Sequence, residues 1–547
     1  MTRKISILLG LGSIAVTPWW TYDPINPVKF IFLCMAGCTS LIYLLLSKRF
    51  FLINKTLLIA STVFVLQIII SLMFSGVNIT SGLFGAYGRL FGALTWIMLL
   101  AIFLFYSVNQ PQEYLLKIFI WVGVISLAYS VFQLLGLDPA PWNNDYDPVI
   151  GLLGNPNFQS SFLGLFFIVV AGKIIQKQNS TRSMIFWSLL APIDLFAIYR
   201  TNSIQGFFVV FIGIMIFLAY ILHFKNYRYL LLTFFTTGIV STVLFVMAVI
   251  GMGPLQSLLY KGTLAIRGDY WITAILMSKS APLTGVGPDN YGENYRLFRP
   301  IESLTRINAE VTSDSAHNGY LDFSANLGVT SLLIYLVFLL LVFRKVSHFV
   351  RHSITLDYNH LIVTAIWVAF NGQLLISPNQ IGLALWGWAF AGLLLSYSNS
   401  HDSLSNYDSN LSIKEKKKAL SKIAPTSFLD LISWVGGIMI GFLVSLPIYV
   451  SSAHFRSALV SADAVRILSA SQDWPRSPTT ILYTARLMFA NNLMEQGLQI
   501  TNFGIREYPD SFEIWRQKLQ YNKLTEAEVI LIKSKLVELD PLNSSLR

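Results

Sequence analysis

Long apolar stretches, each near the length of a membrane-spanning helix, occupy most of the chain. One crossing of the hydrocarbon core needs about 20 predominantly apolar residues. The pattern therefore predicts an all-α, polytopic helical membrane protein with about 13 transmembrane helices. The expected spans are residues 5–19, 28–46, 56–74, 90–107, 115–136, 157–173, 184–199, 203–222, 229–251, 328–343, 358–376, 380–397 and 428–450.

Three polar segments interrupt this pattern. Residues 252–327 are too long for a simple connector, so we expect a functional extracytoplasmic loop. Residues 398–427 are rich in Ser, Asn and Asp and then basic, which is typical of a flexible cytoplasmic linker. The predicted organisation is a transmembrane domain over 1–397 that includes the loop, then the linker, an additional span at 428–450, and a helical domain over 451–547.

The last segment contains a weak internal repeat. Pro509 and Pro541 each follow a helical stretch, and their separation of 32 residues is near the period of about 34 in tetratricopeptide (TPR) repeats. Thr525 and Glu528 have the spacing of a capping box at the start of the last helix. The pattern predicts a TPR-like tail, which either binds a partner or glycan or caps the membrane domain. The sequence favours neither role.

Composition excludes a soluble globular protein. Charged residues are 12 % of the chain and the mean hydropathy is +0.59, whereas soluble proteins contain about 25 % charged residues. Only two cysteines are present, which excludes a disulfide framework. The net charge of +11 would suit nucleic acid, but Lys and Arg collect on one side of the predicted spans. The charge therefore reflects membrane topology, and no nucleic-acid partner is expected.

The distribution of cations also predicts the orientation. Loops 137–155 and 375–380 contain no Lys or Arg, so they belong outside, and the N-terminus belongs in the cytoplasm. An odd number of spans then places the C-terminus outside. The lysine cluster at 414–422 either binds anionic membrane lipids or merely enforces this topology, and the second interpretation is favoured.

His317 is the one histidine in the long outer loop, and it lies directly before the span that begins near 328. An isolated histidine is more often structural than catalytic, so its position alone does not make it a catalyst.

Arginines on the same side strengthen the case for a site. Arg200 lies between two apolar runs with almost no loop, where a charge needs a polar cavity and a partner. Arg267 opens a helical stretch of the loop, and Arg296, Arg299 and Arg306 follow. Guanidinium groups suit phosphate oxygens, so this group predicts an anion. The alternative is pairing with acidic residues of the loop; for the last three arginines the sequence favours neither interpretation, whereas for Arg200 it favours the anion.

Polar residues near these groups complete the candidate site. Asn155 and Asn157 stand where an outer loop enters a span, with amides available to sugar hydroxyls or phosphate. The candidate substrate-binding residues are Asn155, Asn157, Gln205, Tyr270, Arg299, Asn318 and Tyr320.

Taken in order, these motifs resemble the O-antigen ligase superfamily. They are a span-end arginine, an Arg-x-x-Tyr-Trp helix, a Pro-Leu-x-Gly-Val-Gly turn and an Ala-His-Asn-x-Tyr-Leu segment before a transmembrane helix. The superfamily includes O-antigen ligases, O-antigen polymerases and bacterial protein O-oligosaccharyltransferases. The resemblance extends over residues 80–397 and is strongest over 265–330.

The resemblance implies a glycosyltransferase of the C type in the bacterial inner membrane. Its donor would be a glycan on undecaprenyl diphosphate, and its acceptor a lipid, a polysaccharide or a protein. Arg200 and Arg267 would bind the diphosphate, His317 would be the essential histidine, and neither a metal nor a cofactor is expected. Physical chemistry agrees, because arginines stabilise charge on a leaving diphosphate and a histidine can take a proton from an acceptor.

Several alternatives remain open at this point. The added span and the tail depart from the usual outline of the family, so ligase, polymerase and protein oligosaccharyltransferase are all compatible with the chain. An anion or solute transporter also has many spans and a polar outer loop, although neither inverted repeats nor paired broken helices are evident. A third possibility is a noncatalytic receptor whose tail binds a partner.

Overall fold

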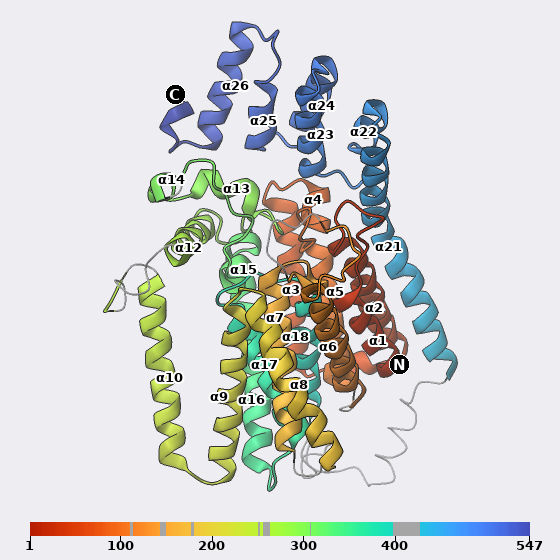
Figure 1. Cartoon of the computed structure of the whole chain (residues 1–547), viewed down its shortest axis with the longest axis vertical. Helices are drawn as coiled ribbons and strands as arrows, with labels where there is room; N and C mark the ends of the chain where they lie inside the picture. Colours follow the sequence, from red (N-terminus) through yellow and green to blue (C-terminus); the bar gives the residue numbers. More distant parts are fainter. Residues whose placement is uncertain are drawn as a thin grey trace.

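The computed structural model describes residues 1–109, 113–142, 149–176, 180–249, 252–254, 263–306, 308–397 and 427–546. Within these ranges every regular element is a helix. Figure 1 shows a bundle of long helices with the helices of the long loop at one end, and the C-terminal helices lie across that same end. We call it the loop end; the predicted topology assigns it to the outer face.

Each of the predicted apolar runs overlaps a helix, although the first helix ends at Ile14, before the end of the predicted run 5–19. These helices are α1 (Thr2–Ile14), α2 (Asn26–Leu46), α3 (Lys55–Phe74), α5 (Ala93–Val108), α6 (Glu113–Leu134), α7 (Pro156–Ile175), α8 (Thr181–Arg200), α9 (Gln205–Phe224), α10 (Arg228–Val249), α16 (Val329–His352), α17 (Tyr358–Gln373), α18 (Ile381–Ser396) and α21 (Ser427–Ser461).

Not all of these helices have the length of a membrane span. Among the described residues, eight helices are long and apolar enough to cross a membrane: α2, α3, α6, α7, α8, α9, α16 and α21. Helices α5 and α18 are apolar but shorter. The all-helical fold with multiple membrane helices is therefore confirmed, whereas the count of 13 spans stays a prediction.

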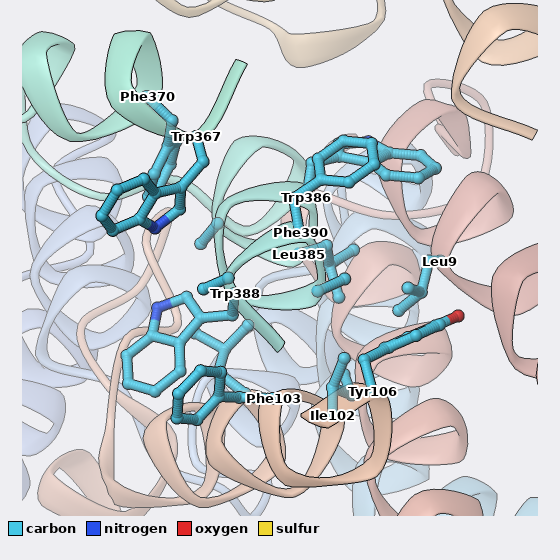
Figure 2. Close-up of a cluster of buried hydrophobic side chains, with 14 of the residues drawn as sticks. Leu9, Ile102, Phe103, Tyr106, Trp367, Phe370, Leu385, Trp386, Trp388 and Phe390 are labelled. Carbon is cyan, nitrogen blue, oxygen red and sulfur yellow. The ribbon is translucent and has the colours of Figure 1, made fainter. Parts of the chain in front are cut away.

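Aromatic side chains fill the centre of the bundle between α1, α5, α17 and α18. Figure 2 shows Trp386 and Trp388 of α18 among rings from the neighbouring helices. The Phe103 and Trp388 rings meet edge to face, with centroids 5.8 Å apart. Gly392 allows the two helices to approach, because a Cβ there would lie 2.3 Å from the Phe103 carbonyl oxygen. The core thus gives the loop end a rigid base.

The described part of the loop forms four helices. These are α12 (Thr263–Ser280), α13 (Tyr291–Phe298), α14 (Glu302–Arg306) and α15 (Gly319–Leu327), and they lie beside the short α4 (Ile79–Phe84). The Val286 N–H donates to the Ala325 carbonyl (2.8 Å), and the Gln67 amide of α3 donates to the Leu327 carbonyl (2.6 Å). The first bond joins two parts of the loop, and the second holds the loop against the bundle.

The C-terminal segment also folds into helices: α22 (Ala464–Ala470), α23 (Pro478–Ala490), α24 (Met494–Glu507), α25 (Phe512–Lys518) and α26 (Glu526–Leu539). The predicted capping box is present, with the Thr525 hydroxyl accepting from the Glu528 N–H. Helix α21 continues past the predicted end of its span at 450 to Ser461. The likeness to TPR repeats stays a prediction, and most of the predicted linker at 398–427 lies outside the described residues.

Candidate functional site

His317 is held at the start of α15. Its backbone has a left-handed φ of +49°, a conformation that histidine adopts more readily than most residues. The Asn318 side chain caps the helix by accepting from the Tyr320 and Leu321 N–H groups. The Gly319 N–H donates to the Leu374 carbonyl (2.7 Å), which ties the histidine segment to the turn between α17 and α18.

The imidazole of His317 stacks on the ring of Tyr270 from α12. Their centroids lie 5.5 Å apart and the ring planes differ by 27°. Tyr270 is in turn packed edge to face on Tyr295, and its carbonyl accepts from the Tyr291 hydroxyl (2.8 Å). The stack therefore fixes the orientation of the imidazole through residues of two loop helices.

The electrostatic surroundings keep this imidazole neutral. Burial lowers the pKa of His317 to about 4, the Asp314 carboxylate opposes this shift, and the positive charges of Arg267 and Arg89 add to it. At neutral pH one ring nitrogen is consequently unprotonated and can accept a proton.

Arg267 approaches the same region from α12. Its guanidinium donates to the Ile376 carbonyl in the turn between α17 and α18. Burial lowers the pKa of Arg267, and Tyr270 opposes that shift. Among the described residues the guanidinium forms no ion pair with a carboxylate, so its charge is available to an anion.

A second group of predicted residues lies at the ends of α7, α8 and α9. Arg200 is exposed at the C-terminus of α8. Asn155 caps α7, Asn157 accepts from the Ser203 hydroxyl (2.7 Å), and Gln205 accepts from the Ser161 hydroxyl (3.2 Å). The bonds of Asn157 and Gln205 thus join α7 to the segment that follows Arg200.

The two groups are connected through α17. This helix packs on α9, where a Cβ at Gly372 would lie 2.4 Å from the Ile212 side chain. At the other side, the Tyr320 hydroxyl donates to the Asn371 carbonyl of α17 (3.0 Å). No contact in the described structure joins Arg200 directly to His317, so the structure brings together His317, Arg267, Tyr270, Asn318 and Tyr320 but leaves Arg200 on a neighbouring helix end.

Arg89 is a residue of this region that the sequence analysis missed. It precedes α5, and its Nε lies 2.9 Å from Asp289 Oδ1 while its Nη1 lies 3.7 Å from Asp314 Oδ1. Burial opposes its positive charge, but Asp289, Asp314 and Asp322 outweigh burial and raise the pKa of Arg89. The available signal was an arginine on the predicted outer side, where the positive-inside rule expects few cations.

Asp322 is the second residue that the sequence analysis missed. One of its oxygens accepts from the Ala316 N–H (2.8 Å), directly before His317. The other oxygen is buried and has no hydrogen-bond partner among the described residues. Burial raises the pKa of Asp322 to about 7, and Arg89 opposes that shift. This carboxyl group therefore orients the backbone that carries the histidine.

The other three loop arginines have carboxylate partners. Arg306 pairs with Asp269 (2.8 Å), as the alternative interpretation expected. Arg299 is buried against Asp540 of the C-terminal segment, with 2.5 Å between Nη2 and Oδ2, and Arg296 joins the same carboxylate at 3.4 Å. These contacts neutralise the charge of Arg299 and shield it from solvent, which indicates a structural role, and its role in substrate binding stays a prediction. Within the described ranges, no group of three or more His, Cys, Asp or Glu residues has the arrangement of a metal site.

Comparison with known proteins gives one result for this region. A family model described as O-antigen ligase matches residues 187–336, a segment that contains Arg200, Arg267 and His317. A search of curated proteins found no match. The family match confirms the resemblance seen in the motifs and indicates a membrane glycosyltransferase like the O-antigen ligases and polymerases. Residues 187–336 are therefore similar to the O-antigen ligase family, in a chain whose described part contains several helices long and apolar enough to cross a membrane.

Proposed function

We propose that this protein transfers a glycan from an undecaprenyl-diphosphate-linked donor to an acceptor at the loop end, as an O-antigen ligase or polymerase. The observation that carries the proposal is a neutral imidazole, stacked on Tyr270, within electrostatic range of an arginine without a carboxylate partner. A general base and an anion-binding group are the two elements that such a transfer needs.

In this mechanism Arg267 and Arg200 bind the two phosphates of the donor. The anomeric C–O bond to the diphosphate breaks, the acceptor oxygen forms the new bond to the anomeric carbon, and the diphosphate leaves on its lipid. Negative charge grows on the departing oxygen, and guanidinium groups stabilise it in the transition state more than in the ground state. His317 takes the proton that the acceptor hydroxyl loses.

Donor binding should also make His317 a stronger base. The positive charge of Arg267 lowers the pKa of His317, and a bound diphosphate would neutralise that charge and add negative charge nearby. Both changes favour the imidazolium, so the pKa of His317 should rise towards neutrality when the donor is present. His317 should therefore be a more effective general base when the donor is bound, since a catalytic group is most effective when its pKa is near the operating pH.

The test is a comparison of His317→Ala, Arg267→Ala and Arg200→Ala in the full-length protein. In a deletion strain, each variant should lose surface glycan transfer and accumulate lipid-linked donor, at unchanged protein abundance. Loss of a general base typically lowers the rate about 10²–10⁴-fold. The matched control is His454→Ala, because His454 is exposed in the C-terminal segment and should tolerate the change.

Two outcomes would contradict the proposal. Full glycan transfer by the His317→Ala variant would contradict the role of His317 as general base. It would favour the transporter or receptor alternatives. Glycan transfer by the Arg267→Ala variant with unchanged affinity for the donor would contradict the proposal that Arg267 binds the diphosphate. The alternative of a protein O-oligosaccharyltransferase shares this donor chemistry and differs only in the acceptor, which would be detected as glycan attached to a polypeptide.

A further inference from the structure

A cavity of about 850 Å³ lies at the loop end, between the membrane domain and the C-terminal helices. Its walls come from the segment around α4, from residues of the loop near α13, and from the tail on the opposite side. Figure 1 shows how α22–α26 extend across the end of the bundle where α4 and α13 lie. The volume is within the range of about 300–1,000 Å³ that is usual for ligand sites.

Carboxylates dominate the charged lining of this cavity. The membrane domain and its loop contribute Asp23, Asp289, Glu293 and Asp314. The tail contributes Asp473, Glu507, Asp510 and Glu538, whereas the one cationic residue of the lining is Arg476. Three further cations, Arg89, Lys535 and Lys29, interact with these carboxylates from outside the lining. Carboxylates therefore exceed the nearby Lys and Arg cations by two to one.

The remaining lining suits a sugar. Both sides of the cavity contribute aromatic rings. Tyr87 and Phe84 come from the membrane domain, and Tyr508 comes from the tail. The side-chain amides of Asn78 and Asn294 also line it. Carboxylates and amide oxygens accept from hydroxyl groups, and aromatic faces cover the apolar faces of pyranose rings.

The cavity reaches the segment that precedes His317. Asp314 forms part of its lining and lies three residues before the histidine. The same carboxylate is held by Arg89 and acts electrostatically on the imidazole. A glycan that occupied the cavity would therefore contact the carboxylate that acts on the proposed base.

We propose that this cavity binds the acceptor, and that it selects a neutral or amine-bearing glycan over one that carries phosphate. This inference rests on the proposed glycosyl transfer and adds the class of acceptor to it. The diphosphate of the donor is bound by arginines, whereas a phosphate group on the acceptor would face an excess of carboxylates. Like charges placed opposite one another in a binding site exclude a partner.

The experiment compares two acceptors with the purified full-length protein and lipid-linked donor from the host. One acceptor is the neutral oligosaccharide maltoheptaose, and the other is the same oligosaccharide phosphorylated at a terminal hydroxyl. The host's own glycan, released from its carrier, is the positive control for transfer. We expect kcat/KM to be roughly tenfold or more higher for the unphosphorylated form. Equal use of the two forms, or transfer only to polypeptide acceptors, would overturn the inference.

Charge reversal in the cavity provides the second measurement. The double substitution Asp510→Arg and Glu538→Arg should lower the preference for the neutral acceptor several-fold, because both carboxylates are largely exposed and line the cavity. Glu495→Arg is the matched control, since Glu495 is an exposed tail carboxylate outside the lining. An unchanged preference in the double variant would contradict the inference.

A steric variant keeps the test informative if charge reversal disturbs the tail. Thr80 lines the cavity from α4, and Thr80→Trp should raise the KM for acceptor while leaving hydrolysis of the donor by water unchanged. An unchanged KM for acceptor would count against the site. Transfer by His317→Ala would instead refute the proposed function, so the two failures are distinguishable.

Discussion

Replacement of Asp540 by asparagine should release the tail from the loop, because this carboxylate neutralises two buried arginines. Asp540 follows α26 and is fully buried, as is Arg299, and the exposed fraction of the Arg296 side chain is 5 %. Arg299 donates to both carboxylate oxygens, with Nε 3.2 Å from Oδ1. The substitution keeps the shape of the side chain but removes its charge.

The expected magnitude follows from the burial of the pair. Removal of one partner from a buried ion pair costs about 3–5 kcal/mol, since the other charge is left uncompensated. At 1.36 kcal/mol for each factor of ten, the equilibrium between docked and released tail should shift by roughly two to four orders of magnitude. Arg296 retains Glu513 at 2.8 Å, so the lower end of this range is expected.

Hydrogen–deuterium exchange of the purified protein would measure the change. Amides of α25 and α26 should exchange faster in Asp540→Asn, whereas those of α5 and α18 should not. The control is Glu495→Gln, which breaks an exposed pair with Lys523, 3.3 Å long. Exposed pairs contribute about 0–1 kcal/mol. If the two variants exchanged at the same rate, the claim that Asp540 fixes the tail would be refuted.

Two further predictions concern the loop. The kcat/KM of the wild type should fall only as the pH drops through about 4, because the active form of His317 is neutral and its pKa in the free enzyme is lowered to about 4. In contrast, kcat reports the enzyme with bound donor and should begin to fall at a higher pH. A decrease of kcat/KM near pH 6.5 would contradict the lowered pKa of His317 in the free enzyme. Gly285→Ala should lower the Tm, because Gly285 has a φ of +64° and a Cβ there would lie 2.5 Å from the backbone of Asn326. The left-handed conformation alone costs roughly 1–2 kcal/mol, whereas Gly436→Ala, where a Cβ meets nothing within 4 Å, should leave the Tm unchanged or raise it.

The helices were predictable because the signal for them is local. Run length and apolar character place α2, α3 and α9 within a few residues of the predicted spans. The capping box at Thr525 is equally local, since its two residues are three positions apart. The end of α21 was less predictable, because the helix leaves the apolar run and continues into a polar sequence to Ser461.

The pairing of charges was not predictable from the sequence. Arg299 and Asp540 are separated by 241 residues, and Arg89 and Asp289 by 200. A motif shows which residue types are present, whereas the choice of partner depends on how distant elements meet. The motifs singled out His317 and Arg267, which the structure places in one region. They gave no signal for the partner of Arg299, and Arg89 was overlooked.

Helix α21 sets the height and direction of the tail. Its 35 residues correspond to about 52 Å, which exceeds the hydrocarbon thickness of about 30 Å. Glycines at 437 and 441 let it approach α2 closely at Thr39 and Met35. Each residue of a helix turns the chain by about 100°, so one inserted residue above this contact would rotate Asp540 away from its arginines. The number of residues in α21 is therefore constrained, as are the carboxylates that the tail contributes to the cavity.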